Sequence, residues 1–457
     1  MLGTNKIKKI HFIGVGGAGM SGIAEILINL NFQVSGSDLL ESKITKRLES
    51  LGLVFFNIHE GENLSEVDLV VFSSAIKQDN PEIIDAKKNN IKIVKRAEML
   101  AELTNLKKSI LIAGSHGKTT TTCIAAHIFK ENNLDPTYII GGKVSSFESN
   151  ANLGDGKHIF AEADESDGSF LLFNPDKAII TGIDNDHLET YQGNIENLKK
   201  AFVDFIKKVK STVFILDLEK KWLKDLSLGT EKIITYGFSS DADYKIIHYS
   251  QNQKGSSFVV KDKKSDLEHL FEIGIHGQHN ILNSLAAILI ALDEGIKLPG
   301  IRKALSSFAQ VERRFEIISD NVFGKRITLV DDYGHHPSEL KATIETIKEI
   351  WPDKKVVMAF QPHRYSRTKA LFHDFVDILS KIDNLILMEI YPASELPIKN
   401  YSSEDLFCEV KKNNKNVVLV NGIEEAFEEF KNFSDQKYIF LTQGAVSYTH
   451  LRAHETS

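Results

Sequence analysis

The stretch SILIAGSHGKTTTT, from Ser109 to Thr122, predicts the fold of the middle of the chain. A strand-like apolar run ends at Gly114, and Gly117 is followed at once by Lys118 and four threonines. Small residues between a strand and a helix allow successive backbone N–H groups to curl around phosphate oxygens at the positive end of the helix. The pattern therefore predicts a strand, a phosphate-binding loop and a helix.

This loop has the residue types that grip ATP or GTP. Lys118 would place an ammonium group on the terminal phosphates, and the Thr119 hydroxyl would bind a phosphate-associated Mg²⁺ ion. The loop is shorter than the usual G-x-x-x-x-G-K-[ST] pattern, because Ile112 stands where the first glycine belongs. A Gly-Lys helix start without a ligand is the alternative. The expected ATP-binding residues of the loop are Gly114, Ser115, His116, Gly117, Lys118, Thr119 and Thr120.

The composition is that of an ordinary soluble globular protein, with 42% hydrophobic and 26% charged residues in 457. At about 150 residues per domain, this length predicts about three domains. The formal net charge of −7 argues against a nucleic-acid partner. Two cysteines, Cys123 and Cys408, fit a reducing cytosol better than a disulfide framework. Glycines and Glu25 interrupt the apolar run Ile10–Leu30, so we expect a cytoplasmic protein without a signal peptide or a membrane segment.

A second glycine-rich motif lies near the start of the chain. GVGGAG, from Gly14 to Gly19, follows a strand-like run and opens a helix, and Asp38 ends the next strand. This is the G-x-G-x-x-G fingerprint of a dinucleotide site, in a doubly wound domain that ends near Leu106. Any diphosphate would meet the same amides, so NAD and a UDP-sugar both remain open. A uracil could be read by short side chains, namely Ser37, Ser73 and Ser74.

Carboxylates and a histidine follow two further strand-like runs. HIFAEADESD, from His158 to Asp167, runs out into four carboxylates, and GIDNDH ends at His187. Ligands collect at the carboxyl ends of parallel strands, so these residues could share a metal site beside the phosphate loop. An acidic surface turn is the alternative. Later, IHGQHNILN starts a long helix whose polar first turn could bind a base or a ribose, or could simply cap the helix.

The pattern restarts near Val311 and predicts a third doubly wound domain. Strand-like runs alternate here with helical segments, and two of them end in DDYGHHP and QPHRYSRT. Arg364 and Arg367 lie three residues apart at the end of a strand, which suits a clamp on a carboxylate or a phosphate. Solvated surface arginines are the alternative.

Taken together, these motifs resemble the Mur ligases, the ATP-dependent amide-forming enzymes of peptidoglycan precursor synthesis. The match runs from about Lys8 to Ala445 and includes the short G-x-x-G-K-T loop that this family uses. It rests on GVGGAGMSGIAE, SHGKTTTT, EADESD, DNDH, HGQHNILN, ERRF, DDYGHHPSE and QPHRYSRT in one order. The resemblance implies an α/β protein of three domains. These are a Rossmann-like domain for the UDP-sugar (1–106), a central P-loop ATPase-like domain for ATP (107–310), and a Rossmann-like domain for the amino acid (311–445).

The resemblance also implies the catalytic and nucleotide-binding residues. Carried over position by position, Lys118 would hold phosphates, Thr119 and Glu162 would bind Mg²⁺, and His187 would ligate a second metal. Asn280 and Asp332 would fix the adenine and the ribose, and Arg314 would reach the terminal phosphate from the third domain. The expected catalytic residues are Lys118, Glu162, His187 and Arg314.

Two further sets of residues follow from the resemblance. The UDP-sugar would be bound by Gly16, Gly17, Ala18, Gly19, Met20, Ser21, Ser37, Asp38, Ser73 and Ser74. The incoming amino acid would be surrounded by Tyr333, His335, Arg364 and Arg367.

The activity implied by the resemblance is the ATP-dependent joining of L-alanine to the lactyl carboxylate of UDP-N-acetylmuramate through an acyl phosphate. Its partners would be these small molecules, with ATP and Mg²⁺ as cofactors and without a nucleic acid or a membrane. A ligase that attaches a preformed tripeptide to the same sugar is the alternative within the family. An NAD-dependent dehydrogenase is the alternative outside it, although it leaves the second phosphate loop unexplained.

The last twelve residues, 446–457, depart from the family pattern. The family continues through a glycine turn into a final helix, whereas this chain ends VSYTHLRAHETS. That sequence has neither a glycine turn nor an apolar periodicity, so it resembles foreign sequence. We therefore expect a segment that packs poorly, and trimming at Ala445 is expected to leave the melting temperature unchanged.

Overall fold

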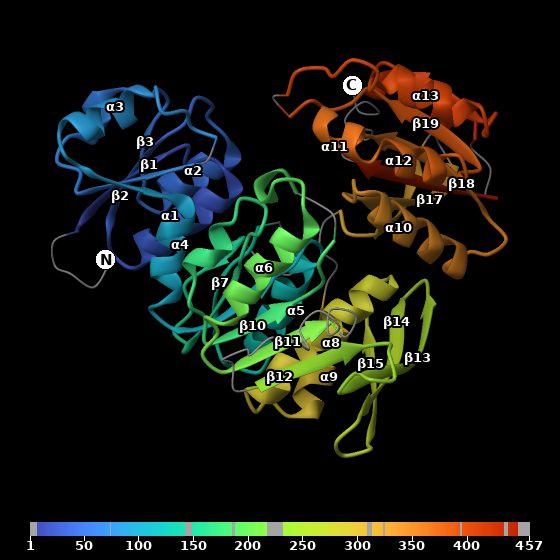
Figure 1. Ribbon diagram of the computed structural model, residues 1–457, viewed down its shortest axis with the longest axis horizontal. Helices are drawn as coiled ribbons and strands as arrows, with labels where there is room; N and C mark the ends of the chain where they lie inside the picture. Colours follow the sequence, from blue (N-terminus) through green and yellow to red (C-terminus); the bar gives the residue numbers. More distant parts are fainter. Residues whose placement is uncertain are drawn as a thin grey trace. The chain divides into compact units, whose positions relative to one another are not determined.

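The computed structural model describes residues 7–73, 75–141, 149–184, 188–216, 232–308, 313–322, 325–393, 395–433 and 437–446. Three sheets of five, ten and six strands organise these residues (Figure 1). The chain forms two compact units. One unit comprises Met1–Tyr249, Ser257–Ile273 and Asn280–Ala309, and the other comprises Ser250–Ser256, Gly274–His279 and Gln310–Ser457. The α/β fold class predicted from the sequence is confirmed.

The first sheet is wholly parallel, with strand order β3-β2-β1-β4-β5. Its strands are β1 (Lys9–Ile13), β2 (Gln33–Ser37), β3 (Val54–Phe56), β4 (Leu69–Phe72) and β5 (Lys92–Lys95). Its helices are α1 (Ala18–Asn29), α2 (Lys43–Ser50), α3 (Pro81–Lys88) and α4 (Arg96–Thr104), with the 3₁₀ turn η1 (Gly61–Leu64). The sequence reasoning missed β3, because its three residues lack an extended apolar run.

The second sheet has the order β15-β14-β13-β12-β11-β10-β6-β9-β7-β8. Its first strands are β6 (Lys108–Ala113), β7 (Thr137–Ile139), β8 (Ala151–Asn152), β9 (His158–Glu162), β10 (Lys177–Ile180) and β11 (Thr212–Leu216). The remaining strands are β12 (Lys232–Gly237), β13 (Tyr244–Asn252), β14 (Gly255–Asp262) and β15 (Glu268–Ile273). Its helices are α5 (Lys118–Glu131), α6 (Ile195–Ile206), α8 (Gln278–Asp293) and α9 (Leu298–Ser307), with the turns η2 (Ser169–Leu172) and η3 (Leu188–Tyr191).

Strands β10, β6 and β9 lie side by side and parallel in the middle of the second sheet. Helices cover both faces of a parallel sheet, so such strands read as continuous apolar runs without alternation. Accordingly, every residue of β10 is buried, and in β6 only Lys108 is partly exposed. The carboxyl ends of β6, β9 and β10 therefore meet at one edge of the sheet.

The first two sheets share one hydrophobic core. Residues of α1 such as Ile23 and Leu27 belong to the same buried cluster as Ile139 and Ala151 of β7 and β8. A Cβ atom on Gly22 of α1 would lie 3.2 Å from Cβ of Ala151, so a glycine allows this close approach. This packing holds the glycine-rich turn that precedes α1 against the central sheet.

The third sheet has the order β16-β17-β21-β18-β19-β20, in which only the edge strand β16 is antiparallel to its neighbour. Its strands are β16 (Glu316–Val322), β17 (Lys325–Asp332), β18 (Lys355–Gln361), β19 (Asn384–Met388), β20 (Val417–Val420) and β21 (Tyr438–Gly444). Its helices are α10 (Pro337–Ile350), α11 (Tyr365–Ala370), α12 (Phe372–Leu379), α13 (Ser403–Lys411) and α14 (Ile423–Lys431). The predicted strands of the third domain are all present.

Among the residues that the structure describes, no helix combines the length and the apolar content that a bilayer crossing requires.

Val446 does not behave as part of a poorly packed tail. Its side chain is 1% exposed and packs in a cluster with Ile327 and Phe440. Its backbone carbonyl accepts a hydrogen bond of 2.6 Å from Arg313. The expectation of poor packing is therefore wrong for Val446, while residues 447–457 lie outside the described part of the chain.

A chain that ends at Ala445 should melt below a chain that ends at Val446. Losing a buried valine side chain and its carbonyl contact should lower the unfolding free energy by about 2 kcal/mol. Differential scanning calorimetry of the two truncated chains beside the full chain measures this difference. Equal melting temperatures for both truncations would show that Val446 adds nothing.

Candidate active site

The phosphate loop connects the carboxyl end of β6 to the first residue of α5. Gly117 caps this helix with φ of 82° and Gly114 has φ of 134°, both in the region that favours glycine. A Cβ atom on Gly114 would lie 2.3 Å from Oγ1 of Thr181, and one on Gly117 would lie 2.3 Å from Oδ1 of Asn283. Both positions therefore require glycine, for conformational and for steric reasons.

Gly117→Ala should raise the dissociation constant for ATP about tenfold or more, because both the clash with Asn283 and the backbone strain distort the loop. Isothermal titration calorimetry with ATP measures this change. Gly193→Ala is the matched control, because Gly193 has φ of 71° but no neighbour within 4 Å of the added Cβ. A tenfold loss of affinity in the control as well would mean that general destabilisation causes the effect.

The remaining polar residues of the loop contact the segment that follows β10. The Ser115 hydroxyl accepts a hydrogen bond from the backbone N–H of Asp184 at 2.9 Å. His116 lies with Nε2 3.5 Å from the Asp184 carboxylate. Thr120 is buried inside the first turn of α5. The loop and the GIDNDH segment are thus joined, although His187 itself lies outside the described residues.

The ammonium of Lys118 is held within the loop. Its Nζ donates to the Gly114 carbonyl at 2.7 Å and to both carboxylate oxygens of Glu165, at 3.0 and 2.7 Å. Burial by itself would lower the pKa of Lys118, but Glu165 and Asp164 raise it above its usual value. Lys118 is therefore a fixed positive charge at the place where terminal phosphates would bind.

Glu162, the last residue of β9, faces the start of α5. Its carboxylate accepts hydrogen bonds from the Thr119 hydroxyl at 3.1 Å and from the backbone N–H of Gly141 at 2.7 Å. Burial would raise the pKa of nearby Asp164, but Lys118 draws it below the usual value. A hydroxyl and two carboxylates provide the hard oxygen ligands that Mg²⁺ prefers, so these residues fit that ion.

The glycine-rich turn before α1 is held by Asp38, which follows β2. One Asp38 carboxylate oxygen accepts the backbone N–H of Gly16 at 2.9 Å. Gly17 caps α1, and Met20 and Ser21 are buried in its first turn. Ala18 begins the helix.

Arg96, at the start of α4, packs on this turn. A Cβ atom on Gly19 would lie 3.2 Å from Cδ of Arg96, so the arginine covers the glycine directly. Burial by itself would raise the pKa of Asp164, but the Arg96 charge adds to the larger lowering effects of Lys118 and Ser166. The sequence reasoning missed Arg96, because a lone arginine in a helical run resembles any surface cation.

The three serines expected to read a uracil differ in their surroundings. The Ser37 side chain is buried and its hydroxyl donates to the Glu82 carboxylate at 2.7 Å, within a polar cluster that includes His59. This position is unsuited to the predicted base contact, because the hydroxyl is engaged inside the domain. Ser73 lies beside the turn, with its Cβ 3.3 Å from the place of a Cβ on Gly14. Ser74 lies outside the described residues.

A cavity of about 320 Å³ joins the glycine-rich turn to the phosphate loop. It is bounded by residues of α1 and its turn, of α4, of the start of α5, and of the carboxyl ends of β4, β7 and β9. The polar or turn residues among them are Gly17, Gly19, Ser73, Arg96, Lys118, Gly141, Glu162 and Asp164. Residues predicted for the UDP-sugar and residues predicted for ATP thus face one space.

Asn280, in the first turn of α8, is 2% exposed. Its Oδ1 accepts a hydrogen bond of 3.2 Å from Asn283, which is the residue that crowds Gly117. The HGQHNILN segment therefore reaches the phosphate loop. The sequence reasoning named Asn280 but not Asn283, although the two residues are three positions apart on one helical face.

Four aromatic rings form a chain at the carboxyl ends of β17, β18 and β19. Tyr333 and His335 lie with ring centroids 5.3 Å apart, His335 and His363 lie 5.4 Å apart, and His363 stacks on Tyr391 at 5.4 Å. Arg367 is 8% exposed, and its guanidinium donates to the His363 carbonyl at 3.3 Å. The structure thus brings together Tyr333, His335 and Arg367, three of the four residues predicted for the amino acid.

His363 also belongs to this group. It lies within the motif QPHRYSRT, but it was not among the residues predicted to bind the amino acid. Burial together with Arg367 and Arg364 lowers the pKa of His363 to about 4, so its imidazole is neutral at pH 7. Arg364, the fourth predicted residue, is more exposed, at 47%, and its guanidinium lies 4.0 Å from Glu395. Its backbone has φ of 73°, which is uncommon for a residue other than glycine.

Asp332 is engaged within the third domain. Its carboxylate accepts hydrogen bonds from the backbone N–H groups of Phe315 at 2.8 Å and Gly334 at 2.7 Å, and one from the side-chain amide of Gln443 at 3.0 Å. Burial raises the pKa of Asp332, against the opposing effect of Arg314. The Arg314 guanidinium lies 5.7 Å from the ring centroid of Tyr333. Asp332 therefore orders the strand end that carries Tyr333.

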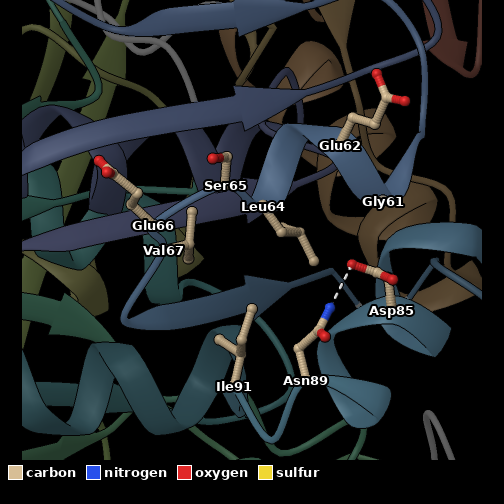
Figure 2. A pocket seen from close by; sticks show the side chains of 9 residues that line it. All are labelled: Gly61, Glu62, Leu64, Ser65, Glu66, Val67, Asp85, Asn89 and Ile91. Carbon is tan, nitrogen blue, oxygen red and sulfur yellow. Dashed lines mark hydrogen bonds between the residues drawn. The ribbon is translucent and has the colours of Figure 1, made fainter.

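A larger hollow, of about 630 Å³, lies between η1 and α3 in the first domain (Figure 2). It contains none of the predicted site residues. Its acidic side chains are Glu62, Glu66 and Asp85, and the Asp85 carboxylate accepts a hydrogen bond of 2.8 Å from Asn89. The larger of these two cavities and the predicted site residues therefore do not coincide.

Family models match nearly the whole chain. The model described as "Mur ligase family, catalytic domain" matches residues 9–108, "Mur ligase middle domain" matches 112–291, and "Mur ligase, glutamate ligase domain" matches 313–446.

Individual proteins with similar sequences bear one enzyme name. The UDP-N-acetylmuramate–L-alanine ligase of Wigglesworthia glossinidia brevipalpis is 43% identical over 447 residues, which cover 95% of this chain and 94% of the relative. That of Geobacter sulfurreducens is 45% identical over 426 residues, covering 93% and 91%. The crystal structure of UDP-N-acetylmuramate–alanine ligase from Thermotoga maritima superposes with a TM-score of 0.80 at 29% identity, covering 98% of each chain.

Proposed function

This chain belongs to the Mur ligase family, and on that premise we propose that it joins L-alanine to UDP-N-acetylmuramate at the expense of ATP, in peptidoglycan precursor synthesis. The relatives named above carry this enzyme name over almost their whole length. The observation that carries the proposal is the cavity shared by the glycine-rich turn and the phosphate loop. Family membership removes the dehydrogenase alternative, since a dehydrogenase has no use for the loop at Lys118.

The shared cavity suits transfer of a phosphoryl group between two bound substrates. The turn at Gly17 and Gly19 would hold the diphosphate of the UDP-sugar, with Arg96 beside it. The lactyl carboxylate of the sugar would then face the terminal phosphate of ATP, which Lys118 would hold. A carboxylate oxygen bonds to the γ-phosphorus while the bond from that phosphorus to the β–γ bridging oxygen breaks, and an acyl phosphate and ADP result.

Amide formation follows from the acyl phosphate. The alanine amine attacks the acyl carbon, the carbon–oxygen bond to phosphate breaks, and the amine gives up a proton. Because acyl phosphates hydrolyse readily, the site must exclude water during this step. Magnesium, bound by Thr119 and Glu162, would supply charge neutralisation between the two anionic substrates. His187 would bind a second metal in this proposal.

The group around Tyr333 in the third domain suits the amino acid. Arg367 and Arg364 would bind the alanine carboxylate, because planar guanidinium groups match it with two parallel hydrogen bonds. The neutral imidazole of His363 and the rings of Tyr333 and His335 would border its small side chain. Asn280 and Asp332 would contact the adenosine, and Arg314 the terminal phosphate.

Phosphate release from ATP in the presence of UDP-N-acetylmuramate tests the proposal. Alanine, serine, glycine and the preformed tripeptide are added in turn. The proposal expects release with alanine well above that with the tripeptide. Release with the tripeptide alone would favour the alternative ligase, and no release with any acceptor would contradict both.

Arg367→Lys should raise the KM for alanine about tenfold or more while changing the KM for ATP less than twofold. Lysine keeps the positive charge but cannot make the paired contact with a carboxylate. Steady-state kinetics with each substrate varied separately measure both constants. Equal increases in both would place Arg367 outside the amino-acid site.

A further inference from the structure

Glu165 is the direct counter-ion of Lys118. Both of its carboxylate oxygens lie within 3.0 Å of the ammonium, and its side chain is 1% exposed against 16% for that of Lys118. The Gly114 carbonyl accepts from the same ammonium at 2.7 Å. An ammonium has three protons to donate, so these three acceptors match its full donor capacity.

The backbone of Glu165 is held in place by η3. The Tyr191 hydroxyl donates a hydrogen bond to the Glu165 carbonyl, and Thr190 donates to the carbonyl of Ser166 at 2.6 Å. Gly168 closes the turn by donating its N–H to the Glu165 carbonyl at 3.0 Å. Burial together with Glu165 raises the pKa of Tyr191, so its phenol remains a donor. Glu165 is therefore a fixed partner of the lysine, on a loop with several supports.

The surroundings of Lys118 are already rich in negative charge. Glu162, Asp164 and Glu165 all act on the ammonium electrostatically. A triphosphate in the loop adds several more negative charges close to the same group. The lysine cannot satisfy the terminal phosphates and both oxygens of Glu165 at once, because it has too few protons.

We propose that Glu165 is a positioning residue, which holds the Lys118 ammonium inside the phosphate loop and competes for it with the terminal phosphates of ATP. The inference rests on the proposed function, since it takes the phosphates to be those of ATP. Glu165 should therefore stabilise the nucleotide-free protein more than the nucleotide complex, because phosphate would replace it as the partner of the lysine. By linkage, its charge weakens nucleotide binding and favours release of ADP.

Calorimetric titration of the full chain with ATP and Mg²⁺, without the sugar and alanine, tests the inference. Glu165→Gln should lower the dissociation constant of ATP about tenfold. The free variant should also melt below the wild type, and saturating ATP should raise its melting temperature by more than it raises that of the wild type. A purely structural role predicts weaker binding instead. An unchanged or higher dissociation constant in Glu165→Gln overturns the inference.

Asp167→Asn is the matched control. Asp167 is an exposed residue of the same loop, and its carboxylate accepts the N–H of Ser169 at 2.9 Å. Asp167→Asn deletes one negative charge of the same loop and leaves the hydrogen bonds of Lys118 in place. The affinity for ATP should therefore change less than about twofold. A tenfold higher affinity for ATP in Asp167→Asn as well would show that any lost negative charge has this effect, and it would overturn the inference.

A second variant covers the case in which Glu165→Gln does not fold. Glu165→Asp keeps the charge but withdraws it from Lys118 by one methylene, and it should lower the dissociation constant about threefold. An unchanged constant in this variant would overturn the inference. Absence of ATP binding by the wild type would instead contradict the proposed function, so the two failures are distinguishable.

Discussion

Replacing Lys118 by methionine should lower kcat about a thousandfold or more. The side chain supplies the positive charge inside the phosphate loop, in a site where charge is worth more than in water. Methionine keeps the length of the side chain and removes its charge. Phosphate release at saturating ATP, UDP-N-acetylmuramate and alanine measures the loss. A folded variant with turnover within tenfold of the wild type would contradict the role of the lysine.

The Lys118 variant also leaves the buried Glu165 carboxylate without its partner. Its fold must therefore be checked by circular dichroism and thermal melting, because an unpaired buried charge costs several kcal/mol. Lys130→Met is the matched control. Lys130 lies in the last turn of the same helix and is exposed, so its removal should leave kcat within about twofold.

Glu294→Ala should lower the unfolding free energy of the chain by about 3 kcal/mol. The Glu294 side chain, just after α8, is 3% exposed and accepts hydrogen bonds from Lys108 at 2.6 Å and from His158 at 2.9 Å. Lys177 pairs with it as well. Alanine leaves these three donors without their shared carboxylate. Urea unfolding at pH 7 measures the loss.

The effect of Glu294 should depend on pH with a defined sign. Burial alone would raise the pKa of Glu294, but His158, Lys108 and Lys177 hold it well below its usual range. A carboxylate with a depressed pKa stabilises the fold above its unfolded pKa of about 4.3, and this stability is lost as the pH falls further. The difference in unfolding free energy between Glu294→Ala and the wild type should therefore reach its full value at pH 7 and be smaller at pH 3.5.

An exposed glutamate provides the comparison. Glu196, on α6, has a side chain that is 69% exposed and pairs with Lys199 one turn away. Glu196→Ala should change the unfolding free energy by less than about 0.5 kcal/mol at either pH. A loss of about 3 kcal/mol in unfolding free energy in Glu196→Ala as well would contradict a specific role of the buried Glu294 cluster. No loss in Glu294→Ala would contradict it too.

Local patterns predicted the strand, loop and helix around Lys118 well. β6 ends in an apolar run, from Ile110 to Ala113, and the glycines that follow it are required by backbone angles and by close neighbours. The sequence was less informative where the element was short, as with β3. It was also misleading for Val446, because an apolar residue beside a polar tail carries no sign of the cluster into which it packs.

The partners of the site residues came from tertiary structure. EADESD offered four carboxylates, and only the packing of the loop on η3 selects Glu165 as the one that meets Lys118. Arg96 and His363 likewise have no local mark of function. Ser37 shows the reverse case, in which a short polar residue near a nucleotide motif donates its hydroxyl to a buried glutamate instead.

The sequence by itself determined the parallel strands that precede the site motifs and that chemically active residues follow their carboxyl ends. Apolar periodicity and glycine placement are local properties, so they can be read along the chain. The tertiary structure alone decided which side chains meet. The Lys118–Glu165 pair spans 47 positions and the Lys108–Glu294 pair spans 186. Such pairs depend on strand order and on the direction in which each loop leaves its strand, and both are set by the packing of the whole domain.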